Sequence, residues 1–129
     1  MKVTYPFGQP AGYQLQSFGT LRTQLGVTQP SYRNGNVDHG KGALLFKFHN
    51  YFGPVEITIS LEKIGRTGVL SDPVVIDVLK GGVRFVLFDE YSPRYDSNKT
   101  YCEIWVTSKG PNLDGDASVK FDIYRRWRA

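Results

Sequence analysis

Hydrophobic and polar residues alternate with a period of two from residue 43 onward, which is the pattern of β-strands that bury one face. Leu44, Phe46 and Phe48 alternate in the first such stretch. In the clearest stretch, residues 55–62, the apolar side chains share one face and the polar side chains share the other. The apolar face of this second stretch consists of Val55, Ile57, Ile59 and Leu61.

A tight turn is predicted at Gly81-Gly82, since paired glycines tolerate the positive φ that two-residue hairpin loops require. If the two glycines form the loop, one face of the hairpin over residues 74–88 is wholly apolar. Turn chemistry and side-chain pattern therefore agree on an antiparallel hairpin. The predicted cross-strand pairs are Lys80 with Val83, Val78 with Phe85, and Ile76 with Leu87.

Two further stretches, residues 101–107 and residues 118–127, alternate in the same way. In the second of them Val119, Phe121 and Ile123 are predicted to face inward. Turn-rich segments separate the six predicted strands, and no segment has a helical period. The sequence thus predicts an all-β fold, a two-layer antiparallel β-sandwich or jelly roll, in preference to an α/β fold. We expect Ile57, Ile59, Phe85 and Phe121 in its core.

Residues 1–42 differ from the rest of the chain in composition. They hold half of the fourteen glycines and all of the glutamines, and their apolar residues follow no sustained period. Such a segment buries too little apolar area to offset its ordering entropy alone. We therefore predict an extended N-terminal arm over residues 1–42 and a β-sandwich body over residues 43–129. A short helix or strand near residues 15–25 stays open.

The formal charge of +4 is unevenly distributed along the 129 residues. Residues 1–42 carry four cations and one Asp, and Arg125, Arg126 and Arg128 add three positive charges at the C-terminus, so the residues between are net acidic. Basic ends on an acidic body indicate contacts with an acidic protein surface or with nucleic acid. Solvated charge at the chain ends explains the same pattern.

Membrane and disulfide signals are weak in this sequence. The first residues lack the apolar run of a signal peptide, and no stretch approaches the ~18 apolar residues of a transmembrane helix. The single cysteine, Cys102, excludes an internal disulfide, which suits a reducing compartment. We expect no membrane partner.

Catalytic candidates are few, and each has a simpler explanation. His39 and His49 do not have the spacing of metal sites or catalytic triads and are read as surface histidines. Cys102 alternates with apolar neighbours and is read as a buried small hydrophobe. The carboxylates of Asp89-Glu90 and Glu103 are candidates for glycoside hydrolysis, but adjacent carboxylates on an extended chain point apart. We predict no enzymatic activity and no cofactor.

A weak calcium candidate lies before the last predicted strand. Asn112, Asp114 and Asp116 place oxygen-bearing side chains at alternate positions, as one side of a calcium site requires. The segment lacks the bidentate acid that closes such a site. An ordinary Asp-Gly turn explains it equally well, so we predict no metal site.

Aromatic side chains cluster in the second half of the chain. Tyr91, Tyr95, Tyr101 and Trp105 can form a stacking platform for sugar rings or bases if they face outward. Tyr101 and Trp105 share one strand face. We favour a core position for this face, which is the usual environment of Trp in a sandwich.

The function that best fits these features is that of a non-catalytic structural or assembly subunit. A small β-sandwich with a polar arm and oppositely charged body and ends is expected most often among virion components, such as phage capsid decoration or tail-associated proteins. The partners would be other copies of the chain or a larger assembly such as a capsid, with nucleic acid disfavoured. The residues predicted to bind them are Arg22, Arg33, Arg125, Arg126 and Arg128.

The principal alternative is a carbohydrate-binding module or lectin-like domain that uses Tyr91, Tyr95, Tyr101 and Trp105. An enzyme acting on polysaccharide is a third class. For the assembly subunit we expect a location in the virion after assembly in the host cytoplasm. Otherwise we expect a cytoplasmic protein, or one secreted without a cleaved signal.

Overall fold

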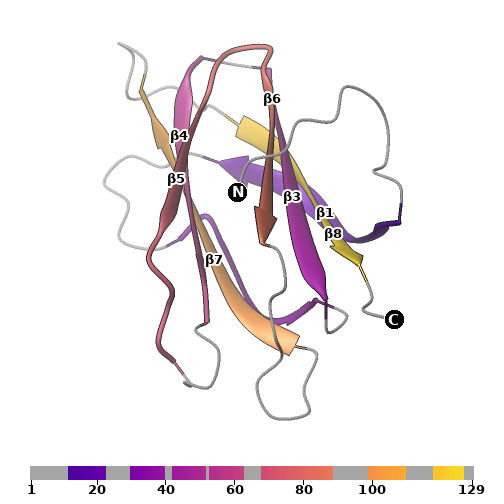
Figure 1. The fold of residues 1–129 in the computed structure, drawn as a ribbon. Coiled ribbons are helices and arrows are strands. Elements are labelled where there is room, and N and C mark those ends of the chain that lie inside the picture. Colours follow the sequence, from indigo (N-terminus) through magenta and orange to yellow (C-terminus); the bar gives the residue numbers. More distant parts are fainter. Residues whose placement is uncertain are drawn as a thin grey trace.

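The computed structural model describes residues 12–22, 30–39, 42–51, 53–62, 68–88, 99–109 and 118–126. These residues form eight β-strands and no helix, arranged in two layers (Figure 1). The strands are β1 (Gln14–Arg22), β2 (Tyr32–Asp38), β3 (Ala43–Asn50), β4 (Val55–Leu61), β5 (Val74–Val78), β6 (Val83–Phe88), β7 (Lys99–Ser108) and β8 (Ser118–Arg126).

Each layer is a four-stranded antiparallel sheet. Sheet A has the order β1-β8-β3-β6 and sheet B has the order β2-β7-β4-β5. The pairing is nested along the chain, because β1 pairs with β8, β2 with β7, β3 with β6 and β4 with β5. Two further pairings, β3 with β8 and β4 with β7, complete the sheets. The predicted all-β, two-layer antiparallel sandwich is confirmed.

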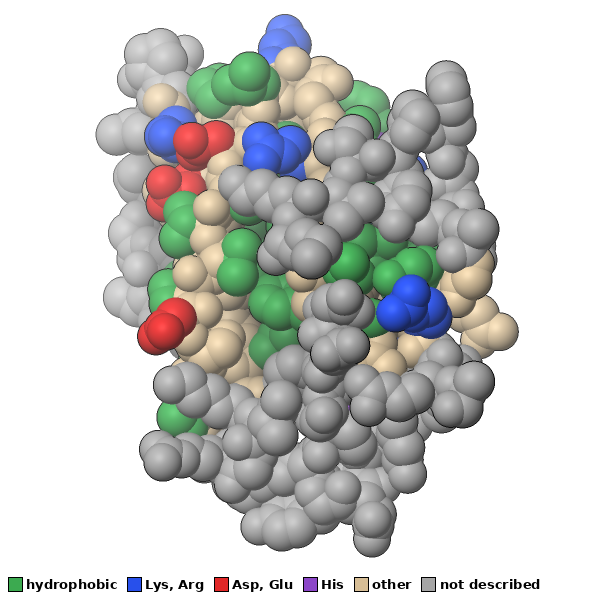
Figure 2. Space-filling model, in the orientation of Figure 1, with side chains coloured by type: hydrophobic (Ala, Val, Ile, Leu, Met, Phe, Trp, Pro, Cys, Tyr) green, Lys and Arg blue, Asp and Glu red, His purple; other side chains and the backbone are tan. Residues whose placement is uncertain are grey.

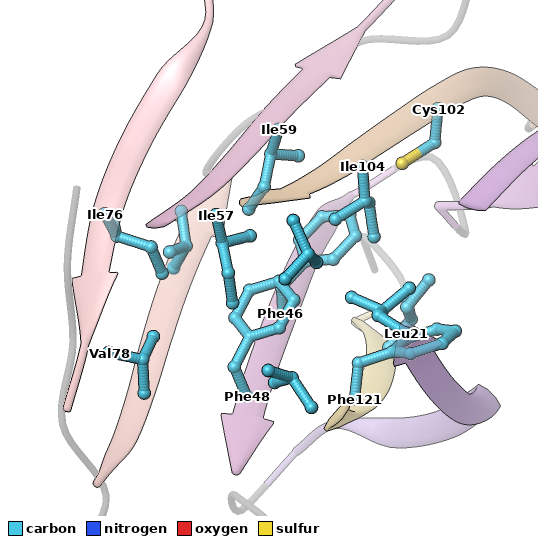
Figure 3. Close-up of a cluster of buried hydrophobic side chains, with 14 of the residues drawn as sticks. Leu21, Phe46, Phe48, Ile57, Ile59, Ile76, Val78, Cys102, Ile104 and Phe121 are labelled. Carbon is cyan, nitrogen blue, oxygen red and sulfur yellow. The ribbon is translucent and has the colours of Figure 1, made fainter. Parts of the chain in front are cut away.

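The main hydrophobic core fills the space between the two sheets (Figure 3). Sheet B contributes alternate residues of β4 and β7, among them Ile57 and Ile104, and sheet A contributes aromatic side chains. Phe46 packs edge-on against Phe88 with 5.4 Å between ring centroids. Burial of each such side chain contributes about 1.5–3 kcal/mol to the free energy of folding, and this burial holds the two sheets together.

A second, smaller hydrophobic cluster lies on the outer face of sheet A. Its buried members are Tyr13, Ala43, Leu45, Phe85 and Tyr124. Because β3 contributes to both clusters, residues 43–46 are buried without a break, in contrast to the strict alternation of a strand with one wet face. The burial predicted for Ile57, Ile59 and Phe121 in the main core is confirmed. Phe85 is also buried, but in this second cluster.

The hairpin predicted over residues 74–88 is wrong in its pairing. A turn is present, with Gly81 at φ 76° and the Gly82 amide donating to the Leu79 carbonyl at 2.8 Å. However, β5 pairs with β4 in sheet B, whereas β6 pairs with β3 in sheet A. The chain crosses from one layer to the other at this turn (Figure 1). Alternation predicts which face a strand buries, but it does not predict its partner.

The buried end of β3 holds this crossing turn in place. Asn50 donates from Nδ2 to the Val78 carbonyl at 2.8 Å, and the Gly81 amide donates to the Asn50 carbonyl at 2.6 Å. The Asn50 amide in turn donates to the Gly82 carbonyl at 3.0 Å. One polar residue of sheet A thereby fixes the end of β5 in sheet B. Buried amides require such partners, which makes Asn50 a specific constraint on the crossover.

The extended arm predicted over residues 1–42 is not confirmed. Two parts of it are strands inside the sheets, since β1 pairs along β8 from Gln14↔Arg125 to Arg22↔Ser118 and β2 pairs with β7. Leu21 and Val37 belong to the main core. The strand left open near residues 15–25 agrees with β1. Both β1 and β2 are edge strands that bury few side chains, so their alternation is weak. Residues 1–11 lie outside the described residues.

Candidate interaction surfaces

The outer face of sheet A carries most of the exposed cations of the described strands. Val119 and Phe121 of β8 point into the core, so Lys120 and Asp122 point outward. The strand register places Phe18 beside Asp122 and Asp122 beside Lys47. The charged residues of this face are Arg22, Lys47, Lys120 and Arg126, with Asp122 as the one carboxylate among the described residues. We call it the basic face.

Aromatic side chains stand among these cations. Phe18 of β1 is 72% exposed, a large fraction for a phenylalanine in a strand. Tyr51, directly after β3, is 59% exposed, and Lys120 Nζ lies 5.6 Å from its ring centroid. Arg126 lies 5.5 Å from the ring centroid of Tyr13 in the same way. Cation–π contacts of this kind hold long side chains over the sheet and contribute about 0.5–1 kcal/mol at exposed sites.

His49 and Asp122 form the polar centre of the basic face. His49 Nε2 lies 3.5 Å from Asp122 Oδ2, with both side chains about a quarter exposed. Burial and the neighbouring Lys47 lower the pKa of His49, while Asp122 raises it and Lys120 lowers it further. The net direction is downward, so the imidazole is neutral near pH 7. The positive charge of this face therefore comes from lysine and arginine.

The outer face of sheet B is built differently. Cys102, Ile104 and Val106 of β7 enter the core, so Tyr101, Glu103 and Trp105 lie on the outer side, each partly exposed. The favoured core position of Tyr101 and Trp105 is therefore wrong, since the smaller apolar residues of β7 occupy the core instead. Across the sheet Trp105 is followed by Thr58 of β4 and then by Val75 of β5.

Carboxylates outnumber cations by four to three among the described residues of this second surface, which we call the acidic face. Its acids are Glu56, Glu62, Asp77 and Glu103, and its cations are Arg33, Lys99 and Lys109. In Figure 2 the acidic side chains lie on the left with a basic side chain beside them, and further basic side chains lie at the top, near the centre and on the right. Lys109 is paired with Asp77 at 2.9 Å, and the hydrogen bond and charge of Asp77 raise the pKa of Lys109.

A shallow hollow of about 420 Å³ lies at one end of the acidic face. It is lined by Gly35, Glu62, Gly68, Leu70, Tyr101 and Glu103. Among the described residues, the lining combines two carboxylates, one aromatic ring and one aliphatic side chain, without a cation. Such a lining is suited to a cationic or hydroxyl-bearing group, because the carboxylates accept hydrogen bonds and the ring offers a π-face.

The binding role predicted for Arg125 meets a competing contact inside the protein. Arg125 of β8 forms an ion pair and hydrogen bond with Asp38 of β2, and Lys99 Nζ lies 3.7 Å from the same carboxylate. Asp38 and Arg125 are both mostly buried, and their pairing joins sheet A to sheet B at one edge of the sandwich. A partly buried, charge-assisted contact of this kind acts first as a structural cross-link.

The other predicted binding residues are dispersed. Arg22 and Arg126 are exposed on the basic face, whereas Arg33 is exposed on the acidic face. The structure brings Tyr101 and Trp105 to one surface. The remaining candidates, Arg128, Tyr91, Tyr95, Asn112, Asp114 and Asp116, lie outside the described residues.

The catalytic candidates of the sequence differ in their surroundings. Cys102 is fully buried, as predicted, and burial together with Glu103 raises the pKa of its thiol. His39 was expected at the surface but is fully buried, and burial, with a smaller effect of Lys99, lowers its pKa to about 4. His49 is partly buried on the basic face. Asp89 and Glu90 lie outside the described residues.

The described strands and turns contain neither a cluster of metal ligands nor a helix that could cross a membrane. Three potential metal ligands of the His, Cys, Asp or Glu type do not come together anywhere in those residues. The same residues include no helix with the length and apolar character that a membrane crossing requires.

Sequence reasoning missed Phe18, Tyr51 and Lys120, which together shape the basic face. Phe18 lies in the segment predicted as an arm, and Tyr51 follows a strand end, so neither had an assigned facing. The available signal was the pattern of the last strand, where Lys120 alternates with the inward residues Val119 and Phe121. Comparison of the chain with protein-family models, curated protein sequences and solved structures gives no match.

Proposed function

We propose that this protein is a non-catalytic assembly subunit whose outer sheet faces and edges bind other proteins. The observation that carries the proposal is the exposure of Phe18 in the middle of the edge strand β1, beside Asp122 of β8. Leu15, on the same edge strand, is also exposed. Large apolar side chains on an exposed edge strand, with charged groups on the neighbouring strands, are typical of protein-binding surfaces.

The nested strand order supports a finer version of this proposal. Eight antiparallel strands in which the first pairs with the last, and each inner pair repeats this relation, have the order of a jelly roll. Jelly rolls serve widely as building blocks of capsids, which makes a virion component, such as a capsid decoration or tail-associated subunit, the preferred setting. The location that follows is the virion, after assembly in a host cytoplasm.

The test is the association state of the protein, alone and with candidate particles, measured by sedimentation velocity. Phe18→Ser should weaken association, because it removes the exposed ring from β1 without touching the core. Leu79→Ser is a matched control, since Leu79 is 69% exposed but lies in the turn before β6. Equal behaviour of both variants and the parent would contradict a binding role for the β1 edge.

A carbohydrate-binding module is the second candidate, and one observation favours it. Tyr101 and Trp105 lie on the outer side of β7, and Tyr101 lines the hollow together with Glu62 and Glu103. Aromatic rings beside carboxylates can stack on a sugar and accept hydrogen bonds from its hydroxyls. Retention on insoluble polysaccharides, lost on Trp105→Ala but kept on Phe18→Ser, would support this candidate over the assembly subunit.

A further inference from the structure

The two outer faces of the sandwich carry opposite charge. On the basic face four cations stand against Asp122. On the acidic face the carboxylates Glu56, Glu62, Asp77 and Glu103 stand against the cations Arg33, Lys99 and Lys109. Among the described residues, the balance is therefore positive on sheet A and negative on sheet B.

Each face also presents apolar surface beside its charges. Phe18 is 72% exposed on the basic face, one strand from Asp122 and close in register to Lys120. On the acidic face Val75 is 48% exposed and lies in one row with Thr58 and the partly exposed Trp105. Apolar side chains surrounded by charge have the composition of a protein interface, with an apolar centre and a polar rim.

The two faces belong to different layers and point away from each other, so one chain cannot bring them together. A second copy can place its acidic face on the basic face of the first. Two basic faces, in contrast, would oppose four cations to four cations, and two acidic faces would oppose carboxylates, and such like-charge contacts cost several kcal/mol. Charge complementarity therefore selects the contact between unlike faces.

We propose that copies of this chain stack through their unlike faces, with sheet A of one copy against sheet B of the next. The inference rests on the proposed assembly function and names its partner, a second copy of the chain. The contact is heterologous, so a stacked pair leaves one basic and one acidic face open in total, and the contact repeats into a ring or an open stack. Lys120 and Arg22 lie on one side of it, and Glu56 and Glu103 on the other.

The test uses charge reversal on each face separately. One variant carries Arg22→Glu and Lys120→Glu, which makes its basic face acidic. The other carries Glu56→Lys and Glu103→Lys, which makes its acidic face basic. Arg22 and Lys120 are exposed and Glu56 and Glu103 are partly exposed on the outer face, so the core is left intact. Lys80→Glu is the control, because it also reverses the charge of a side chain but lies in the exposed turn before β6, outside both faces.

Sedimentation velocity and light scattering at 0.1 M and 1 M salt measure the association of each protein. The parent and Lys80→Glu should associate with rising concentration, and less at high salt, since screening shortens the Debye length from ~10 Å to ~3 Å. Each reversed variant alone should associate roughly tenfold or more weakly, because both of its faces then carry the same sign. Circular dichroism confirms that each variant is folded.

The decisive sample is the equimolar mixture of the two reversed variants. It contains the unaltered basic face of one variant and the unaltered acidic face of the other. The association of the mixture should therefore be about as strong as that of the parent. A mixture that stays monomeric, or a single variant that associates as the parent does, would overturn the stacking proposal. If the parent is monomeric alone but binds a particle, the stacking proposal is wrong and the assembly function stands. If the parent binds only nucleic acid or polysaccharide, both the stacking proposal and the assembly function are wrong.

Discussion

His49 of β3 and Asp122 of β8 face each other at 3.5 Å across the centre of sheet A. The carboxylate raises the pKa of the imidazole, while burial and Lys47 lower it more, so the net direction is downward. Because these influences have opposite signs, they can be separated by substitution. A histidine within a cationic surface is thereby kept neutral at a pH where a free imidazole would already be partly protonated.

The first prediction concerns this balance. Asp122→Asn removes the influence that raises the pKa of His49, so the pKa should fall further below its usual range. Lys47→Gln removes an influence that lowers it and should move the pKa upward. An NMR titration of the imidazole protons measures both. Shifts in the same direction for the two variants would contradict the assigned geometry.

The second prediction concerns buried His39, whose pKa in the folded protein is about 4. The unfolded chain binds a proton near pH 6.5 while the folded chain does not, so the free energy of unfolding should fall as the pH drops from about 6.5 to about 4. The contribution of His39 is on the order of 2–3 kcal/mol across this window. Denaturant unfolding at several pH values, compared between the parent and His39→Gln, measures it. A parent and variant with the same pH dependence would argue against the buried position.

The third prediction concerns the close approach of β1 to β8. A Cβ at Gly19 would lie 3.0 Å from the Phe121 ring, so Gly19→Ala should be destabilising unless the ring moves. Phe121→Ala alone should cost about 3–5 kcal/mol. In the double variant the ring is absent, and the added methyl should cost less than it does in the parent. Unfolding midpoints of the four proteins give this coupling, and additive effects would place Gly19 away from the ring.

The fourth prediction tests whether β1 is an integral strand. Leu21→Ala should lower the free energy of unfolding by about 2–4 kcal/mol, because Leu21 is fully buried in the main core. Phe18→Ala, three residues earlier in the same strand, should change it by only about 0.5 kcal/mol, because Phe18 is exposed. Chemical denaturation distinguishes the two. If both variants were as stable as the parent, residues 14–22 would be an appendage after all.

The sequence predicted the facing of the strands where alternation is strong, and it did so for particular residues. Ile57, Ile59 and Phe121 are in the core as expected because each alternates with polar neighbours. For β1 a strand near residues 15–25 was only one open alternative, and β2 was not predicted, because both strands bury few side chains. The sequence also did not predict which strands pair with each other, since β5 and β6 are neighbours in sequence but belong to different sheets.

The candidate surfaces were harder to predict than the fold. The basic face joins Phe18, Lys47 and Lys120, which come from three strands far apart in the chain, and only the register of β1, β8 and β3 places them together. Arg125 shows the opposite case, because its charge suggested an external partner while Asp38 already binds it. The distribution of charge along the chain therefore suggested a basic binding surface, but it did not show which cations form that surface.

The nested pairing of the strands also constrains how the protein forms during synthesis. β4 and β5 are close in the chain and can pair early, whereas Gln14 of β1 pairs with Arg125 of β8, a contact that forms only after residue 125 has left the ribosome. Until then β8 is missing between β1 and β3, and sheet A is divided into two separate parts. During that interval core side chains such as Leu21 and Phe48 are not yet fully covered and are open to aggregation. Pairing of β8 is therefore the step that completes sheet A and buries them.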